Sequence, residues 1–158
     1  MVSTRRRLIS CALEVLASEG VDAVTVRRVA RAAGISHGAP LRHFPSRAAL
    51  LGAVAGAGFG QLSARFAALP GGTANERVIA ACESYVEFAR SNPALFELMF
   101  RAELAAMGQE VFEQFRVLVT ALPASDLVAT SLWAALRGLA LLPDVDAVLA
   151  VTLDAYVR

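Results

Sequence analysis

The stretch AGISHGAPLRHFPSR, residues 33–47, combines two glycines, other small residues, two histidines and two arginines between two longer helical patterns. Gly34 can adopt the left-handed conformation that ends many helices. Ser36 suits the capping position of a new helix, and the Phe-Pro pair after His43 suits its end. The stretch therefore predicts a tight turn and a short helix over residues 36–43, which form a helix-turn-helix with the helix before them.

The rest of the chain has apolar residues at helical spacing, as in the series Ile9, Ala12, Leu13 and Leu16. A capping box, TANE at residues 73–76, and an Asn-Pro pair at residues 92–93 mark two further helix starts. No run of alternating β-branched residues indicates a strand. We expect an all-α fold of about nine helices. The expected helices begin near residues 3, 25, 36, 46, 73, 92, 109, 126 and 145.

The positive charge of this 158-residue chain is concentrated near its start. Residues 1–50 hold eight arginines against three acidic residues, a net charge of +5, although the whole chain carries +1. All the basic residues are arginine, whose guanidinium makes forked contacts with phosphate that lysine cannot make. This distribution indicates a head that binds a polyanion and a C-terminal part with a different role.

The short helix has the composition expected of a segment that reads DNA. In a helix-turn-helix this helix enters the major groove by its first residues. Gly38 and Ala39 are small, which lets the backbone approach the base edges, and Pro40 offers an apolar surface for a thymine methyl group. The expected exposed donors are His37, Arg42 and His43. The expected core anchors on either side are Ile35 and Phe44.

Residues 8–51, LISCALEVLASEGVDAVTVRRVARAAGISHGAPLRHFPSRAALL, resemble without a gap the N-terminal DNA-binding domain of the tetracycline-repressor (TetR) family. The resemblance implies that Thr25 and Arg28 touch the DNA backbone. Leu41 stands where members commonly carry a tyrosine, whose hydroxyl contacts a phosphate, so that bond is absent here. The residues that the resemblance places nearest the bases are Ser36, His37, Ala39 and Pro40. Those that it places on phosphates are His43 and Arg47.

The same resemblance implies a division of labour along the chain. Residues 1–46 would form the helix-turn-helix domain, and residues 47–158 a domain for ligand binding and dimerisation. Members of the family bind double-stranded DNA at palindromic operators as homodimers and respond to a small molecule held in the C-terminal helices. Two stretches, SNPALFELMF (91–100) and LWAALRGLALL (132–142), resemble one TetR subgroup in which the second stretch reads W-x-x-x-H-G-L. Arg137 replaces that histidine.

The C-terminal helices supply candidate residues for an effector pocket and a dimer seam. Stripes of aromatic and apolar residues at helical spacing are typical of a core, and the resemblance implies that some of them line a pocket. Few charges lie near them, so the effector is expected to be apolar or amphipathic. The pocket candidates are Leu62, Phe66, Tyr85, Phe88, Phe96, Met99, Phe100, Phe112, Phe115 and Trp133. The last two helices have apolar faces too wide for the surface of a monomer. The seam candidates there are Leu132, Leu136, Leu139, Val148, Leu149, Thr152 and Tyr156.

Other kinds of site find no support in the sequence. His37 and His43 are six residues apart, on different faces of a helix, and do not suit a metal pair. Both histidines lie in the DNA-reading segment, so no catalytic triad or Cys-His pair can be assembled. The glycines of GAVAGAGFG, residues 52–60, follow no strand and are interpreted as close helix packing instead of a phosphate loop. We expect a non-enzyme without a cofactor.

The sequence also predicts a cytoplasmic protein with no membrane span. No stretch reaches the ~18 uninterrupted apolar residues that a span requires. The N-terminal segment is interpreted as an amphipathic helix and not a signal peptide. Cys11 and Cys82 are expected to be reduced core thiols.

We therefore interpret the chain as a homodimeric regulator, most simply a repressor, that a small apolar or amphipathic effector releases from its operator. Two alternatives stay open. One is a DNA-binding dimer without an effector, whose C-terminal part serves only to dimerise. The other is a helical carrier of apolar ligands whose DNA-binding head is degenerate, as the absence of a tyrosine at Leu41 would allow.

Overall fold

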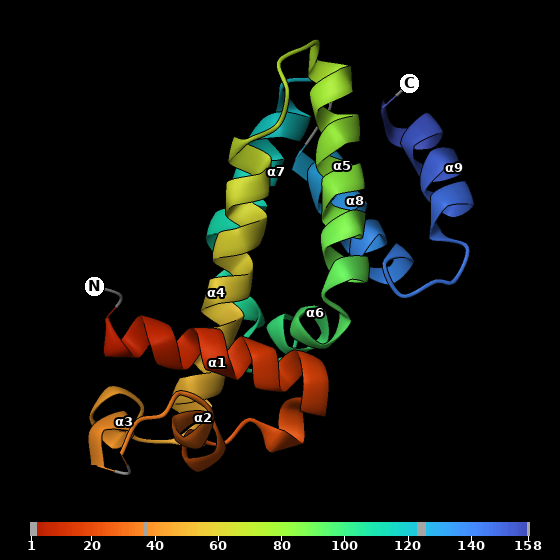
Figure 1. The fold of residues 1–158 in the computed structure, drawn as a ribbon. Coiled ribbons are helices and arrows are strands. Elements are labelled where there is room, and N and C mark those ends of the chain that lie inside the picture. Colours follow the sequence, from red (N-terminus) through yellow and green to blue (C-terminus); the bar gives the residue numbers. More distant parts are fainter. Residues whose placement is uncertain (1–2, 37, 123–125, 158) are drawn as a thin grey trace. The chain divides into compact units, whose positions relative to one another are not determined.

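The structure, a computed structural model, describes residues 3–36, 38–122 and 126–157, without the side chains of residues 38–40 and 126. Within these ranges the chain forms nine α-helices, two short 3-10 helices and no strand, so the predicted all-α fold is confirmed (Figure 1). The elements are α1 (Thr4–Glu19), η1 (Val21–Ala23), α2 (Val26–Ala32), α3 (Gly38–His43), α4 (Arg47–Ala67), α5 (Ala74–Ser91), α6 (Pro93–Met99), η2 (Ala105–Gly108), α7 (Gln109–Thr120), α8 (Asp126–Leu139) and α9 (Val145–Val157). The sequence predicted the nine α-helices. It did not predict the two 3-10 helices η1 and η2.

Side-chain caps make several of the predicted helix starts, but the Asn92 side chain makes no cap bond at the start of α6. The Ser3 hydroxyl accepts a hydrogen bond from the backbone N–H of Arg6 at 3.3 Å, at the start of α1. The capping box before α5 is complete, because Thr73 N–H donates to the Glu76 carboxylate at 2.8 Å and Glu76 N–H donates to the Thr73 hydroxyl at 3.2 Å. These bonds satisfy backbone donors that a helix start otherwise leaves without partners.

The chain divides into two compact units. Unit 1 comprises Met1–Phe59 and Asn92–Gly108, and therefore contains α1, α2, α3, the first part of α4, and α6. Unit 2 comprises Gly60–Ser91 and Gln109–Arg158, with the end of α4 and helices α5, α7, α8 and α9. The predicted functional boundary after residue 46 falls inside unit 1 and stays a prediction.

In unit 1, α1 packs against α2, α3 and α6 (Figure 1), and it buries one apolar stripe. The stripe consists of Leu8, Ala12, Val15 and Leu16, all buried. Gly58 of α4 allows a close approach to α6, because a Cβ there would lie 2.5 Å from the sulfur of Met99. The glycine-rich stretch 52–60 lies inside α4, as the packing interpretation predicted.

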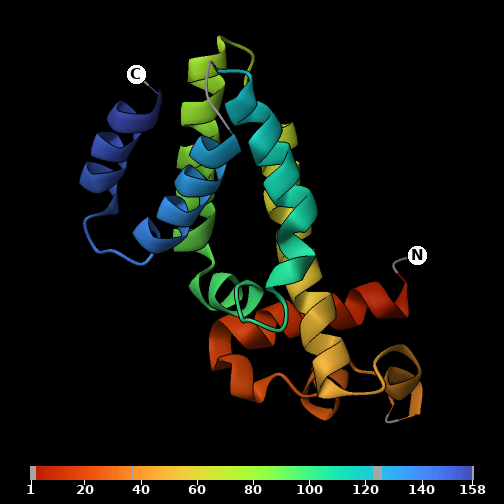
Figure 2. The ribbon, with the colours of Figure 1, turned by 180° about the vertical axis from the view of Figure 1, so that it is seen from behind.

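In unit 2, α5 packs against α7, α8 and α9, and α7 lies beside α8 (Figure 2). The core is an aromatic cluster around Trp133 of α8, whose ring lies 4.9 Å from Tyr85, 5.6 Å from Phe112 and 5.3 Å from Phe115, centre to centre. Edge-on and tilted contacts of this kind stabilise a core beyond the area that they bury. No helix in the described ranges combines the length and hydropathy required to cross a bilayer.

Candidate nucleic-acid interface

The turn between α2 and α3 has the geometry that the sequence predicted. The Thr25 hydroxyl caps α2 by accepting from Arg28 N–H at 3.1 Å. At the other end, Gly34 adopts φ +64°, its N–H donates to the Arg31 carbonyl at 3.1 Å, and Ile35 N–H donates to the Ala30 carbonyl at 3.0 Å. This pair of bonds is a Schellman motif, which turns the chain sharply and requires the left-handed conformation that glycine adopts without strain.

Helix α3 presents a partly apolar, partly basic surface to solvent. Leu41 is 56% exposed, Arg42 and His43 are exposed, and Phe44 directly after the helix is buried in unit 1. Ser36 before the helix is exposed and Ile35 is half-buried. His37 lies outside the described residues, and of Gly38, Ala39 and Pro40 only the backbone is described, so their predicted base contacts stay predictions.

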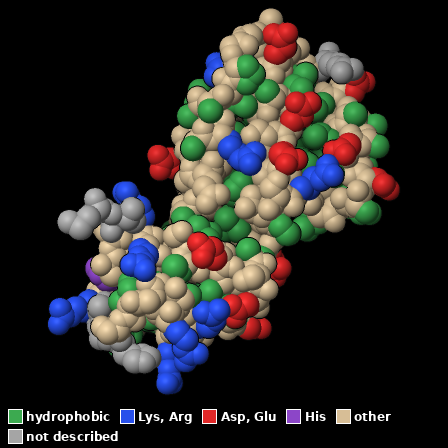
Figure 3. Space-filling model, in the orientation of Figure 1, with side chains coloured by type: hydrophobic (Ala, Val, Ile, Leu, Met, Phe, Trp, Pro, Cys, Tyr) green, Lys and Arg blue, Asp and Glu red, His purple; other side chains and the backbone are tan. Residues whose placement is uncertain are grey.

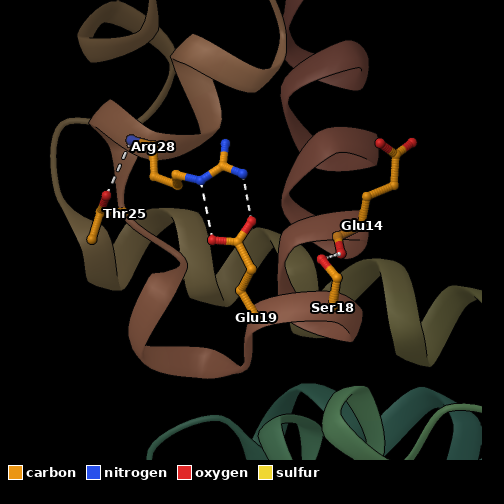
Figure 4. Close-up of polar contacts among 5 residues, drawn as sticks. All are labelled: Glu14, Ser18, Glu19, Thr25 and Arg28. Atoms are coloured by element: carbon orange, nitrogen blue, oxygen red, sulfur yellow. Dashed lines mark hydrogen bonds and ion pairs between the residues drawn. The ribbon is translucent and has the colours of Figure 1, made fainter.

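Arg28, predicted to contact the DNA backbone, is held by an acidic side chain of the protein. Its guanidinium forms a forked ion pair with the Glu19 carboxylate, with Nε 3.2 Å from Oε2 and Nη2 in contact with Oε1 (Figure 4). Glu19 ends α1 and Arg28 lies in the first turn of α2, so the pair joins the two helices. A phosphate could engage this guanidinium only in competition with Glu19.

Arg47, predicted to contact a phosphate, also has partners within unit 1. Its Nε donates to the Val24 carbonyl at 2.9 Å and its Nη2 to the Val21 carbonyl at 2.7 Å. The Asp22 carboxylate lies 3.6 Å from the same Nη2. Arg47 therefore ties the start of α4 to the connection between α1 and α2, a role that its position in the sequence did not indicate.

In Figure 3, basic side chains lie toward the lower and left edges of unit 1, with acidic side chains elsewhere on that unit. The first three helices contribute exposed arginines. Among the described residues, no ion pair engages six of these arginines. The six are Arg5, Arg6, Arg7, Arg27, Arg31 and Arg42. The sequence assigned only Arg42 of this set to DNA, although the run of three arginines at residues 5–7 was visible in it.

The predicted pocket residues are distributed over both units, and most of them are packed. Phe96, Met99 and Phe100 belong to unit 1, where Phe96 and Met99 are buried. Those in unit 2 are Leu62, Phe66, Tyr85, Phe88, Phe112, Phe115 and Trp133. All of these are buried except Phe112 and Trp133, which are half-buried.

The titratable groups in the core of unit 2 are held in their neutral forms. Burial, with a smaller contribution from the nearby Glu83 charge, raises the pKa of the Cys82 thiol to about 12. Burial also raises the pKa of the Tyr85 phenol far above its ordinary value, and the charge of Arg137 partly opposes the shift. Cys82 is therefore an unreactive core thiol at neutral pH. Both cysteines are free, as predicted.

The described part of unit 2 includes two open grooves. One, of about 440 Å³, lies between α4, α5 and α7 and contains only one of the predicted pocket residues, Phe66. Its other lining residues are Ala67, Arg77, Glu110, Glu113, Gln114, Val117 and Leu118. The second, of about 420 Å³, lies between α5 and α9, where Arg90 bonds both carboxylate oxygens of Asp146 at 2.9 and 3.1 Å. The described residues include no cluster of side chains suited to a metal ion.

Some of the predicted seam residues are buried within the chain, and others are exposed or half-buried. Leu132, Leu136, Leu139 and Leu149 are buried within the chain itself, so their side chains are not available to a partner. Val148 and Tyr156 are exposed, and Thr152 is half-buried with its hydroxyl bonded to the Val148 carbonyl. The most exposed large apolar side chains of this region include Leu127 at 77%, Leu141 at 75% and Val151 at 71%.

Two family models match the chain. Residues 8–54 match bacterial regulatory proteins of the tetR family, and residues 78–155 match the tetracyclin repressor-like C-terminal domain. The two matches together cover most of the chain. They include the turn around Gly34 and most of α5 to α9, but do not identify the subgroup that the stretch 132–142 suggested.

Curated relatives agree with this assignment. The HTH-type transcriptional repressor KstR of Mycolicibacterium smegmatis is 34% identical over 100 residues, which cover 62% of this chain and 49% of KstR. The uncharacterized HTH-type transcriptional regulator TtgW of Pseudomonas putida is 43% identical over 51 residues, 32% of this chain and 38% of TtgW. The matched residues thus span half or less of each relative.

Solved structures share the fold along its whole length. A protein of unknown function from Rhodococcus sp. RHA1 is 27% identical, with a TM-score of 0.82 over 100% of this chain and 97% of that one. A transcriptional regulator from the same organism has a TM-score of 0.80 at 24% identity, over 98% of this chain and 96% of that one. These likenesses agree in fold with the two family matches, which show that the chain belongs to the TetR family of transcriptional regulators.

Proposed function

We propose that the chain is a homodimeric repressor that binds a palindromic operator and is released from it by a small apolar or amphipathic effector. The observation that carries the DNA-binding part is the exposed surface of α3, with Leu41, Arg42 and His43 accessible beside a turn held by Gly34. A helix presented in this way can enter a major groove without rearrangement. Repression follows the activity named for KstR, with which the chain is 34% identical over 100 residues.

The dimer is proposed on the exposed faces of α8 and α9. Val148 and Val151 are three residues apart on α9, opposite the buried series Val145, Leu149 and Leu153. A helix that is apolar on both faces buries only one of them within its own chain, and the second face favours a partner. We assign the seam to this exposed face, to Leu127 at the start of α8 and to Leu141 in the connection between α8 and α9.

The effector is proposed to bind in unit 2, at the edge of the aromatic cluster. Phe66 belongs to the groove between α4, α5 and α7, and its ring centre lies 6.1 Å from that of Phe115 in the cluster. An apolar ligand in the groove would contact Phe66, whose ring packs against the cluster. Binding would then shift the population toward a dimer whose reading heads no longer match the operator half-sites.

Fluorescence anisotropy with a DNA fragment from upstream of the chain's own gene tests DNA binding, with an unrelated duplex of equal length as the control. We expect tighter binding to the upstream fragment. Equal binding to both would refute operator recognition, and no binding to either at low salt would favour the apolar-ligand carrier.

Effector binding has an internal reporter, because Trp133 is the single tryptophan of the chain and lies in the cluster. We expect small molecules that native mass spectrometry finds bound to change its fluorescence and to release the DNA. A protein that binds the operator but carries and responds to no small molecule would instead be the effector-independent dimer. We place its action in the cytoplasm, where operator DNA is found.

A further inference from the structure

We infer that Arg5 and Arg7 of α1 clamp the DNA phosphates on either side of α3. The inference rests on the proposed DNA binding and adds to it a contact surface outside the helix-turn-helix. The two side chains come from the first turn of α1, are exposed, and approach α3 near its two ends.

Each arginine is placed by a specific contact within unit 1. The guanidinium carbon of Arg5 lies 5.4 Å from the ring centre of Phe44, the buried residue directly after α3. Nη2 of Arg7 lies 3.7 Å from the point where a Cβ on Gly34 would be, so this guanidinium lies beside the turn that precedes α3. Along the chain, α3 lies between Gly34 and Phe44, the two residues beside which these guanidinium groups lie.

Both guanidinium groups keep their donors for an outside partner. Among the described residues, neither Arg5 nor Arg7 has a hydrogen bond or an ion pair with an acidic side chain, and the contact of Arg5 with Phe44 uses the face of the ring. Arg28 and Arg47 differ, because Glu19 and the Val21 and Val24 carbonyls hold their donors. Cations without an internal partner engage phosphate without first losing another bond.

The partner that fits this arrangement is a pair of phosphate groups on a duplex. A helix in the major groove lies between two sugar–phosphate backbones about 12 Å apart. Cations beside both ends of α3 would come close to these backbones when α3 enters the groove, and guanidinium binds phosphate oxygens through forked donors. Such contacts position the protein and carry no sequence information.

Arg6 provides the matched control. It lies between the two on the same helix and is exposed, but it projects about 100° around the helix axis from each neighbour. No contact of its side chain with Phe44 or the turn is described. Arg5→Gln, Arg6→Gln and Arg7→Gln thus remove the same charge from the same turn of α1 while changing different contacts.

The test is the salt dependence of binding of the full chain to the upstream fragment and to an unrelated duplex. Loss of one phosphate contact in each head of a dimer reduces the slope of log K against log[salt] by about 1.8. We expect this reduction for Arg5→Gln and for Arg7→Gln on both duplexes, with a much smaller change for Arg6→Gln. Arg5→Lys, which keeps the charge, should retain the slope.

The outcomes separate the inference from the proposed function. If the wild-type chain binds DNA and neither Arg5→Gln nor Arg7→Gln changes the slope, or Arg6→Gln changes it equally, the clamp is refuted while DNA binding stands. If the wild-type chain binds no DNA, the proposed function itself fails. Circular dichroism monitors folding, and should Arg5→Gln disturb the Phe44 contact, Arg7→Gln alone decides the question.

Discussion

Nε of Arg47 lies 2.9 Å from the carbonyl oxygen of Val24, and this bond ties the first turn of α4 to the segment that leads into α2. The side chain spans 23 residues of sequence to reach a backbone acceptor. It therefore holds the start of α4 against the helix-turn-helix.

Arg47→Gln should destabilise the protein without changing the number of its phosphate contacts. The shorter side chain cannot reach both carbonyls, and the loss of bonds from a charged donor at a partly exposed position costs about 1–2 kcal/mol. Urea denaturation should report this loss, with Arg42→Gln as the control, because Arg42 is exposed and has no described partner. A reduced salt slope for DNA binding, in place of reduced stability, would return Arg47 to the phosphate-contacting set.

Glu19→Gln should strengthen DNA binding. The substitution removes the carboxylate that holds Arg28, which frees a forked donor near the start of α2 for phosphate. The salt slope should steepen by up to about 1.8 for a dimer. Glu14→Gln is the control, because it removes the same charge from the same helix and its carboxylate has no described ion pair (Figure 4). Equal effects of the two substitutions would mean that only the overall charge matters and that Arg28 does not reach DNA.

The contrast between Gly34 and Arg28 shows what the sequence could predict about the head. The turn at Gly34 depends on hydrogen bonds to residues three and five positions away, so its signal is local and was recognised. The partners of Arg28 and Arg47 are nine and more than twenty positions away in the sequence. A family resemblance transfers the role of a position, but it does not show which carboxylate or carbonyl oxygen of this chain bonds the arginine there. The phosphate contacts of these two residues stay predictions, because the sequence did not reveal the bonds that they make within the chain.

In unit 2, the helical spacing of apolar residues also predicted only part of the structure. It correctly indicates that Tyr85, Phe115 and Leu136 are buried, because a 3.6-residue period identifies the inner face of a helix. It does not show whether that face meets a cavity, a neighbouring helix or a second subunit. Leu136 packs inside the chain, whereas Val151, which the sequence did not select, is exposed on α9.

Leu41→Tyr should raise operator affinity without changing the preferred sequence. Leu41 is 56% exposed on α3, so the larger side chain of tyrosine fits there and its phenolic hydroxyl can donate to a phosphate. A net hydrogen bond of this kind contributes about 0.5–1.5 kcal/mol in each head. Leu41→Phe separates the hydroxyl from the ring, because it should leave the affinity near that of the wild-type chain. A change in the preferred operator sequence for either variant would show that residue 41 contacts bases instead of the backbone.

Val151→Arg should dissociate the dimer and weaken operator binding with it. Two heads on one face of a duplex must lie about 34–36 Å apart, or a multiple of that, and only a fixed seam keeps this distance. Val151 is 71% exposed on its own chain, so an arginine there leaves the fold intact. It places a positive charge in the proposed seam without an acidic side chain to pair with it. Sedimentation should show a shift toward monomer at unchanged helix content.

Two further variants locate the seam. Gln61→Arg adds the same charge to an exposed position of α4 in the same unit and should leave both association and DNA binding unchanged. Leu149→Arg, in contrast, places the charge at a buried position against the α5–α9 groove and should unfold α9 instead of merely separating subunits, because Leu149 is only 6% exposed. If Val151→Arg remains a dimer and still binds the operator, the exposed face of α9 is not the seam, and the apolar residues Leu127 and Leu141 become the positions to test next by the same substitution.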